Sequence, residues 1–255
     1  MPMNPRLLRP RISGFNPKSV PGLFAWWDFA DSSSLTLSGS NITQVLDKSG
    51  NNRTASQATG NNQPTLATAA RNGRNAAQFD GVNDALDASI GSSQFTAMTV
   101  FAVVIADGAG GGSLGRIFDR GFQGSNLQRN NANTALAFTP PWTDATGNAT
   151  QRSAASSFPL SSWLILGVKY TGGTVTGTDI LPRINRAAST AGLTGTSAGF
   201  SVSQSATLNI GNRSQSDGYD RGWDGKIGEL LVYSASLTDA QVVAVETHLA
   251  KKWGF

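Results

Sequence analysis

The chain has 255 residues and no cysteine, and its 20 lysines and arginines against 16 aspartates and glutamates give a net charge of +4. The absence of cysteine excludes disulfides and thiolate metal sites. A chain of this length buries roughly three quarters of the surface that it exposes when unfolded, so one large domain needs no such cross-links. The longest apolar run, MTVFAVVIA at 98–106, is far short of the roughly 20 residues of a membrane helix, and we expect no membrane insertion.

The amino-terminal segment, residues 1–21, differs in composition from the rest of the chain. It holds five of the ten prolines, together with Arg6, Arg9, Arg11 and Lys18, and has no acidic residue. Proline removes amide donors and fixes φ, so this segment is predicted to be an extended arm. Its apolar residues favour packing against a neighbouring subunit, with packing on its own domain as the alternative. It also lacks the 7 to 15 residue apolar stretch of a signal peptide.

Short segments rich in β-branched and aromatic residues follow the arm, separated by Gly, Asn, Asp and Ser, which is typical of strands. The predicted strands are 22–29, 74–80, 97–107, 116–121, 162–170, 179–187, 206–212 and 225–234. In 163–168, WLILGV, the residues are apolar on both sides of the alternation, which indicates a strand covered on both faces. The spacing lacks a regular strand–helix alternation, so an antiparallel sandwich is favoured over a doubly wound sheet. Residues 121–157 are predicted to be long polar surface loops.

The carboxyl terminus has a convincing helical pattern. Thr238 and Gln241 have the spacing of a capping box, Leu237 and Val242 that of a hydrophobic staple, and Gly254 follows as a stop signal. One apolar stripe is formed by Val242, Val245, Leu249 and Trp253. A helix over 238–253 is therefore predicted, and its apolar face should cover an edge or an end of the sandwich.

Six motifs follow one another along the chain: WWD, VLDKSGNN, NQPTL, NGRNAAQFDGVNDAL, LNIGNR and WDGKIGELLVYSASLTDAQVVAVETHLAKKWG. Over residues 22–254 this order resembles the concanavalin A-like jelly roll of the laminin-G-like type, in particular the versions in bacteriophage virion proteins and bacterial surface proteins. The resemblance implies an all-β concanavalin A-like jelly-roll sandwich of two antiparallel sheets at 22–255, with one amphipathic carboxyl-terminal helix. Members of this family mostly bind glycans or proteins, and a minority are glycoside hydrolases or lyases.

Catalytic chemistry finds little support in the residues, and we predict no enzymatic activity and no cofactor. A glycosidase needs two carboxyl groups in a defined separation. The two glutamates are Glu229, with no acidic neighbour at the expected spacing on its strand, and Glu246 on the helix. The one histidine, His248, is expected to be a surface or packing residue, which argues against a catalytic triad.

Binding sites are less constrained by the sequence. Asp80, Asn83, Asp84 and Asp87, and likewise Asp217, Asp220 and Asp224, offer oxygen ligands of the kind that calcium prefers. The same residues are also those of ordinary turns, and we assign no metal site.

Aromatic residues in polar or glycine-rich surroundings, Trp142, Tyr219 and Trp223, could contact a sugar. Trp26, Trp27, Trp163 and Trp253 fit core positions. We therefore assign no catalytic, cofactor-binding or metal residue.

The function expected from this pattern is that of a structural protein on the surface of a phage virion, in capsid decoration or in a tail fibre or spike. Residues 1–21 would anchor it to other virion proteins, it would form a homo-oligomer, and a host-surface glycan is a candidate ligand. It would be made in the host cytoplasm without a signal peptide. No nucleic-acid partner is expected, because outside the arm the arginines are scattered singly. The alternatives are a free carbohydrate-binding module of a bacterial surface or secreted protein and, third, a glycan-degrading enzyme.

Overall fold

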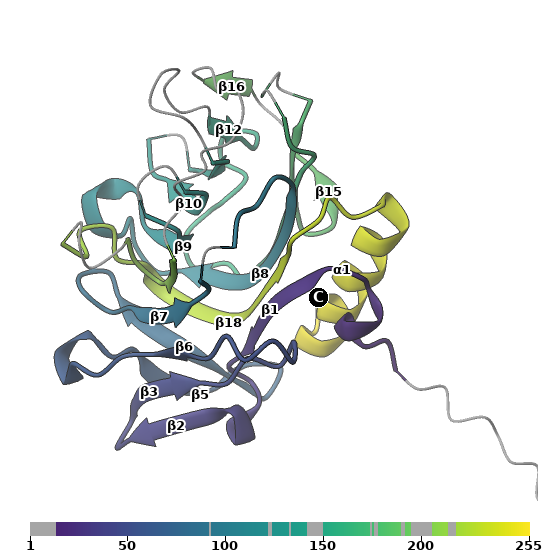
Figure 1. The fold of residues 1–255 in the computed structure, drawn as a ribbon. Coiled ribbons are helices and arrows are strands. Elements are labelled where there is room, and N and C mark those ends of the chain that lie inside the picture. Colours follow the sequence, from purple (N-terminus) through teal and green to yellow (C-terminus); the bar gives the residue numbers. More distant parts are fainter. Residues whose placement is uncertain are drawn as a thin grey trace, which may run out of the picture.

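The computed structural model describes residues 14–91, 93–121, 124–132, 134–141, 150–173, 175, 178–189, 192–194, 206–213 and 218–255. Every strand pair within this part of the chain is antiparallel, and the strands form two curved, stacked sheets with one helix on the outside (Figure 1). The predicted all-β class with one carboxyl-terminal helix is confirmed. No helix in the described ranges has the length and apolar character needed to cross a bilayer.

The first sheet is centred on β18, which pairs along its length with β8. Beyond β8 it continues through β13 and β14 to β15, and on its other side β18 pairs with β1 in its second half and with β6 in its first half. From β6 the pairing continues through β5 and β3 to β2. The strands are β1 (Leu23–Asp28), β2 (Leu35–Ser38), β3 (Asn41–Val45), β5 (Thr65–Arg71), β6 (Arg74–Asp80), β8 (Met98–Ala106), β13 (Leu164–Tyr170), β14 (Ile180–Ile184), β15 (Ala187–Ala188) and β18 (Asp224–Tyr233).

The second sheet faces the first and runs in the order β4, β7, β17, β9, β10, β11, β12, β16. Pairing of β3 with β4 joins the two sheets at one side. Its strands are β4 (Ala55–Ser56), β7 (Leu86–Ser89), β9 (Arg116–Asp119), β10 (Asn126–Asn130), β11 (Ala135–Thr139), β12 (Thr150–Arg152), β16 (Gly192–Thr194) and β17 (Thr207–Ile210). Single 3₁₀ turns lie at Pro17–Ser19, Ser32–Ser34, Gly60–Asn62 and Gly111–Ser113.

Each predicted strand has a counterpart, but the prediction of a continuous polar loop over 121–157 is wrong, because β10, β11 and β12 lie there. In β10 only Leu127 belongs to the core between the sheets, and its neighbours Asn126 and Gln128 are polar. A strand with a polar outer face has too few apolar residues to be recognised from composition. Its pairing with two neighbours holds it in place.

Two apolar cores explain why the central strands are apolar on both faces. An inner core lies between the two sheets, and an outer core lies between the first sheet and the helix. In β13, Leu164, Leu166 and Val168 point into the inner core, whereas Ile165 faces the outer core. The double coverage predicted for this strand is therefore confirmed.

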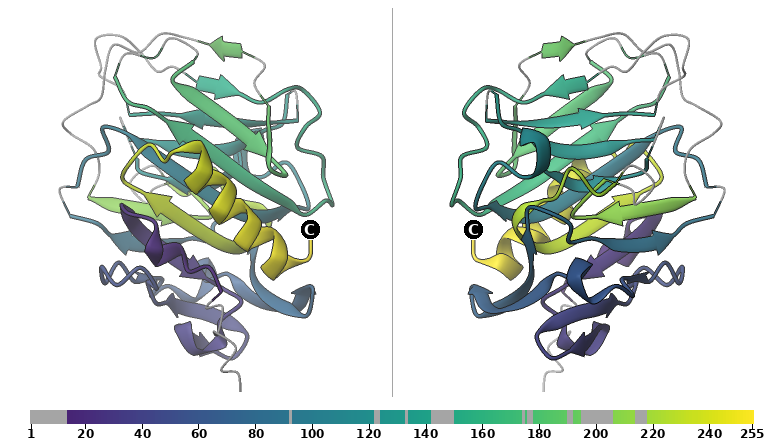
Figure 2. Two further views of the ribbon diagram at one scale, coloured as in Figure 1. Left: turned by 90° about the vertical axis from the view of Figure 1, so that its right-hand side faces the viewer. Right: turned by 90° about the vertical axis from the view of Figure 1, so that its left-hand side faces the viewer.

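The helix α1 (Asp239–Trp253) has the predicted capping box, and Gly254 ends it in the left-handed conformation. It covers the outer face of the first sheet rather than an edge or an end of the sandwich (Figure 2). The predicted stripe, Val242, Val245, Leu249 and Trp253, is buried there against β1, β8, β13 and β18. A face is covered because the outward residues of these strands, such as Phe101 and Leu231, are themselves apolar and need a partner.

The described end of the predicted arm, residues 14–21, packs on its own domain. Phe15 and Val20 belong to the outer core, and the hydroxyl of Tyr233 donates to the carbonyl of Pro17 at 3.2 Å. Asn16 caps a short 3₁₀ turn by accepting from the amide of Lys18, so the segment is not fully extended here. Residues 1–13 lie outside the described part of the chain, and their role as an anchor stays a prediction.

Gly228 forms a β-bulge in β18 that determines where the next side chain points. In the antiparallel pair with β8, Ile227 lies opposite Val104 and Glu229 lies opposite the adjacent Val103. Gly228 therefore has no partner of its own in β8 and is the extra residue of the bulge. Because strand side chains alternate, Glu229 would share the inward face of Ile227 without this bulge. The bulge turns Glu229 outward, toward the helix.

Replacing Gly228 with alanine should destabilise the fold, because the new Cβ would lie 2.4 Å from the ring of Trp253. Overpacking of this kind costs about 1 to 3 kcal/mol, and urea unfolding followed by tryptophan fluorescence would measure it. Gly60→Ala is the matched control, since nothing lies within 4 Å of its added Cβ. Equal unfolding midpoints for the two variants would contradict the close packing of helix and bulge.

Candidate functional site

A pair of carboxylates, Asp28 and Glu229, lies under the helix on neighbouring strands. Asp28 ends β1 directly opposite Glu229 of β18. Glu229 has no acidic neighbour at the expected spacing on its own strand, but a carboxylate from another strand, Asp28, lies beside it. Spacing along one strand could not reveal it.

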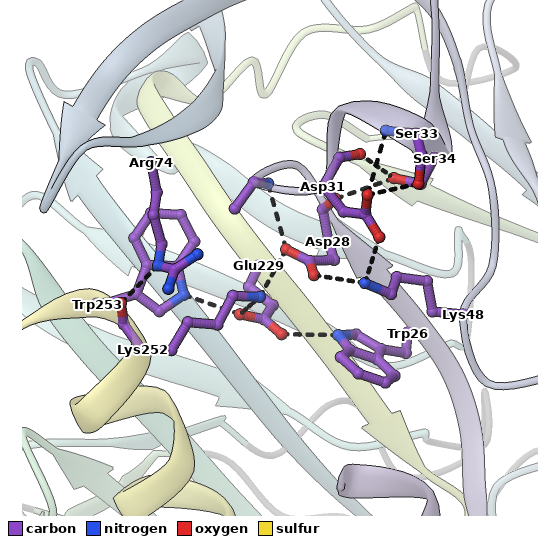
Figure 3. Close-up of polar contacts among 11 residues, drawn as sticks. Trp26, Asp28, Asp31, Ser33, Ser34, Lys48, Arg74, Glu229, Lys252 and Trp253 are labelled. Carbon is purple, nitrogen blue, oxygen red and sulfur yellow. Dashed lines mark hydrogen bonds and ion pairs between the residues drawn. The ribbon is translucent and has the colours of Figure 1, made fainter. Parts of the chain in front are cut away.

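The carboxylate of Glu229 is fully buried and accepts three hydrogen bonds (Figure 3). Its Oε1 accepts from the indole Nε1 of Trp26 at 2.7 Å. Its Oε2 accepts from the indole Nε1 of Trp253 at 2.8 Å and from Lys252 Nζ at 2.7 Å. One side chain thus joins β18 to β1 and to the last turn of α1.

Two ammonium groups hold Asp28. Lys252 Nζ lies 2.7 Å from Asp28 Oδ1, and Lys48 Nζ lies 2.9 Å from Oδ2. Lys48 also bonds Asp31 at 2.6 Å and sits 4.9 Å from the centre of the Trp26 ring system. We call the group Trp26, Asp28, Asp31, Lys48, Glu229, Lys252 and Trp253 the carboxylate cluster.

Burial and charge act in opposite directions on this cluster. Burial raises the pKa of Glu229 and the charge of Asp28 raises it further, whereas Lys252 and the Trp253 indole oppose the rise. At the more open end, the hydrogen bonds from Lys48 and Ser33 lower the pKa of Asp31 to about 2. Both oxygens of Glu229 already have donors and no solvent reaches them, so this carboxylate is placed to hold the helix rather than to exchange protons with a substrate.

A hollow of about 810 Å³ opens between β1, α1 and residues 14–15, with part of the carboxylate cluster in its wall. It is lined by Gly14, Phe15, Trp26, Asp28, Lys48, Arg74, Ala244, Thr247, His248, Lys251 and Lys252. Aromatic rings and cationic side chains therefore share one concave surface, which is the combination that orients a polar ligand with apolar faces.

His248, predicted to be a surface or packing residue, is half-buried, packs against Phe15 and forms part of the wall of this hollow. Its ring centre lies 5.6 Å from that of Phe15, and within the described part of the chain its Nε2 is buried without a hydrogen-bond partner. Burial lowers the pKa of His248, and the nearby charges of Lys252, Arg74 and Lys48 lower it as well, against the opposing effect of Asp28. These effects favour the neutral form of the imidazole.

Asp80, Asn83 and Asp84 of the first candidate calcium group lie together in one turn, where they bond the backbone. The Oδ1 of Asp80 accepts from the amide of Val82 at 2.8 Å, a turn of the kind that aspartate favours. Asp84 accepts from the amide of Asp80, and burial together with the charge of Asp80 raises the pKa of Asp84 to about 6. Asn83 follows Asp80 in the same turn and donates its amide to it.

The other aspartates of the two candidate groups have different partners. Asp87 accepts from Tyr219, and Asp220 pairs with Arg213. Asp224 lies opposite Asp80 in the β18–β6 pair, and Asp217 lies outside the described residues. No group of three or more acidic, histidine or cysteine side chains with metal-binding geometry occurs in the ranges that the structure describes.

Two of the three aromatic candidates for a sugar platform are buried. Tyr219 and Trp223 are 7% and 1% exposed, and Trp223 packs in the inner core beside Phe158. Trp142 lies outside the described residues. Trp26, Trp27 and Trp253 are buried as predicted, and the half-buried Trp163 stacks on Trp253 with ring centres 5.9 Å apart.

A polar row also crosses the second sheet on the face away from the inner core. Residues directly opposite one another in β4, β7, β17, β9, β10 and β11 form it: Ser56, Asp87, Asn209, Asp119, Asn126 and Thr139. Asn209 is 1% exposed and its amide donates to Asp87 at 2.5 Å, so much of this row is committed to internal hydrogen bonds. The hollow beside α1 is the more open of the two polar regions.

The sequence matches no protein-family model and no curated protein. Among solved structures, domain 4 of AbnA, an extracellular GH43 arabinanase from Geobacillus stearothermophilus described in complex with arabinotriose, is similar over 88% of this chain and 98% of its own, with 15% identity and a TM-score of 0.54. The chain has a jelly-roll β-sandwich fold.

Two further structures extend the likeness. The binding domain of Paraclostridial Mosquitocidal Protein 1 shares 12% identity over 91% of this chain and 52% of its own, with a TM-score of 0.60. Trypanosoma rangeli sialidase, described in complex with sialic acid, shares 14% identity over 91% of this chain and 33% of its own, with a TM-score of 0.56. The chain thus spans about half and a third of these two proteins, and at such identities the likeness is one of fold.

Replacing Glu229 with alanine should destabilise the fold strongly, because two indoles and one ammonium lose their acceptor. Removing one partner of a buried charged pair costs about 3 to 5 kcal/mol, to be measured by urea unfolding. Asp107→Asn is the control, since it breaks the 2.9 Å ion pair with Lys226 at the surface and should cost less than about 1 kcal/mol. Equal costs for the two variants would show that the cluster does not hold the helix.

Proposed function

We propose that this protein is a non-enzymatic, carbohydrate-binding jelly-roll domain and that it binds its glycan in the hollow beside α1. The observation that carries the proposal is the meeting of Phe15, Trp26 and His248 with charged donors on one concave surface. Sugar rings have apolar faces that stack on aromatic rings and hydroxyls that bond charged side chains. The arabinanase domain in complex with arabinotriose and the sialidase in complex with sialic acid add support from proteins of similar fold.

The absence of catalysis is proposed from the state of the carboxylates. A glycosidase needs one carboxyl group as an acid and a second as a nucleophile or base, both in reach of the glycosidic bond. Glu229 is fully buried with both oxygens occupied, and Asp28 is held between two ammonium groups. Neither is placed to protonate a leaving group.

The setting that we propose is the surface of a phage virion, in capsid decoration or in a tail fibre or spike. It rests on the resemblance of residues 22–254 and on the proline-rich and arginine-rich segment at the start of the chain, which we propose as the anchor. Self-association into a homo-oligomer belongs to the same proposal. A free carbohydrate-binding module of a bacterial surface or secreted protein is the second candidate, favoured by the near-complete coverage of one domain of an extracellular arabinanase.

A glycan array probed with the whole chain should show binding, and the bound oligosaccharides should remain intact. Incubation of the best binder with the protein, followed by an assay for new reducing ends, checks the second point. Release of reducing ends that is lost in Asp28→Asn would contradict the non-enzymatic proposal. A chain that binds no glycan at high concentration would contradict the carbohydrate-binding proposal itself.

Removing residues 1–13 should abolish incorporation into particles while leaving glycan binding and the unfolding midpoint unchanged. This boundary is chosen because Phe15 and Val20 belong to the outer core, so a longer deletion would damage the domain. Co-sedimentation of the full and shortened chains with particles measures the difference. Equal incorporation of both chains would contradict anchoring by this segment, and no incorporation of the full chain would favour the free module.

A further inference from the structure

The wall of the hollow has more hydrogen-bond donors than acceptors left for a ligand. Asp28, the carboxylate in the wall, already accepts from Lys48, Lys252 and the amide of Ala30. Each of the two lysines has spent two of its three N–H groups on carboxylates. What remains for a ligand is mainly donor capacity, and this favours a ligand rich in acceptors.

Arg74 and Lys251 supply the strongest part of this surplus. The Nε of Arg74 donates to the carbonyl of Lys252 at 2.6 Å, which fixes the guanidinium at the end of α1. Within the described part of the chain, its two Nη groups and the exposed ammonium of Lys251 have no hydrogen-bond or ion-pair partner. Both side chains line the hollow.

The charges around His248 show which cations are left for a ligand. Three cations act on the imidazole of His248: Lys252 of the same helix, Arg74 of β6 and Lys48 of the segment after β3. The carboxylate of Asp28, from β1, acts in the opposite direction. Asp28, Asp31 and Glu229 pair with Lys48 and Lys252, so the positive charge left for a ligand in the hollow is that of Arg74 and Lys251. Phe15, packed against the His248 ring, offers an apolar face beside it.

From this arrangement, and building on the proposed function, we propose that the hollow binds an acidic sugar residue through its carboxylate, with Arg74 and Lys251 as the residues that bind the carboxylate. The guanidinium presents parallel N–H groups that match the two oxygens of a carboxylate, and the ammonium adds a second positive charge. The ring of the sugar lies against Phe15 and His248. A neutral sugar would leave both cations without a counter-charge.

The test compares a panel of uronic-acid and sialic-acid oligosaccharides with their carboxyl-reduced counterparts, in which only the carboxylate is replaced. Isothermal titration with the full chain at low and at high salt gives the affinities. At least one acidic member should bind about tenfold or more tighter than its reduced form, the effect of losing a hydrogen bond to a charged group. Its affinity should fall as salt is raised.

Variants locate the binding. Lys251→Gln and Arg74→Gln should each lower the affinity for the acidic oligosaccharide several-fold, and by a clearly larger factor than the affinity for the reduced form. Arg74→Lys keeps the charge but not the paired N–H groups and should recover part of the loss. Arg186→Gln removes one positive charge from an exposed turn of β14 and β15 and is the matched control, with no change expected.

His248 is the one histidine of the chain, so its imidazole signals can be followed without ambiguity. Its pKa gives a readout that a purely structural role of Arg74 and Lys251 would not change. A bound carboxylate beside it stabilises the imidazolium, so its pKa, followed by NMR, should rise with the acidic oligosaccharide and stay in place with the reduced one.

The outcomes separate this inference from the proposed function. Equal affinity for acidic and reduced oligosaccharides, or no effect of Lys251→Gln and Arg74→Gln, would overturn the inference and leave carbohydrate binding standing. No binding of any oligosaccharide, neutral or acidic, would overturn the proposed function together with it. Inorganic phosphate that displaces the acidic oligosaccharide at equal concentration would identify a general anion site and also overturn the inference.

Discussion

The buried carboxylate of Glu229 is the interaction on which the rest of this structure depends. A carboxylate without solvent is costly unless each oxygen has a donor, and here the indoles of Trp26 and Trp253 and the ammonium of Lys252 supply them. These donors come from the first strand and from the last helical turn, so the two ends of the domain are fixed at one point of β18. The hollow lies beside this junction, with Trp26, Asp28 and Lys252 in its wall.

Local geometry makes this arrangement possible at Gly228. The bulge turns Glu229 away from the inner core, and the missing side chain of Gly228 lets the Trp253 ring lie on the strand. At the same end of the helix, Arg71 and Arg74 donate to the carbonyls of Trp253 and Lys252, which satisfies groups that a helix terminus leaves open. The β5–β6 hairpin therefore caps the helix and also supplies one cation to the hollow.

Much of the fold could be predicted from the sequence because its signals are local. The strand over Leu164–Tyr170 is apolar on both faces, and the capping box at Thr238 fixes the helix start. Strand β10 was missed because a polar outer face with Asn126 and Gln128 has no compositional signature of a strand. The site was missed for a related reason, since Asp28 and Glu229 become neighbours only through the pairing of β1 with β18. Polar or glycine-rich surroundings favoured Tyr219 and Trp223 as sugar contacts, and the fold buries both.

The central claim is that the region where Glu229 holds the helix is also the ligand site. Six tryptophans provide indole N–H signals for a single NMR titration with the tightest-binding glycan. The account predicts that the signals of Trp26 and Trp253, whose N–H groups donate to Glu229, shift on binding while those of the core residues Trp27 and Trp223 stay in place. Shifts confined to Trp27 or Trp223, with Trp26 and Trp253 unchanged, would place the ligand elsewhere and contradict it.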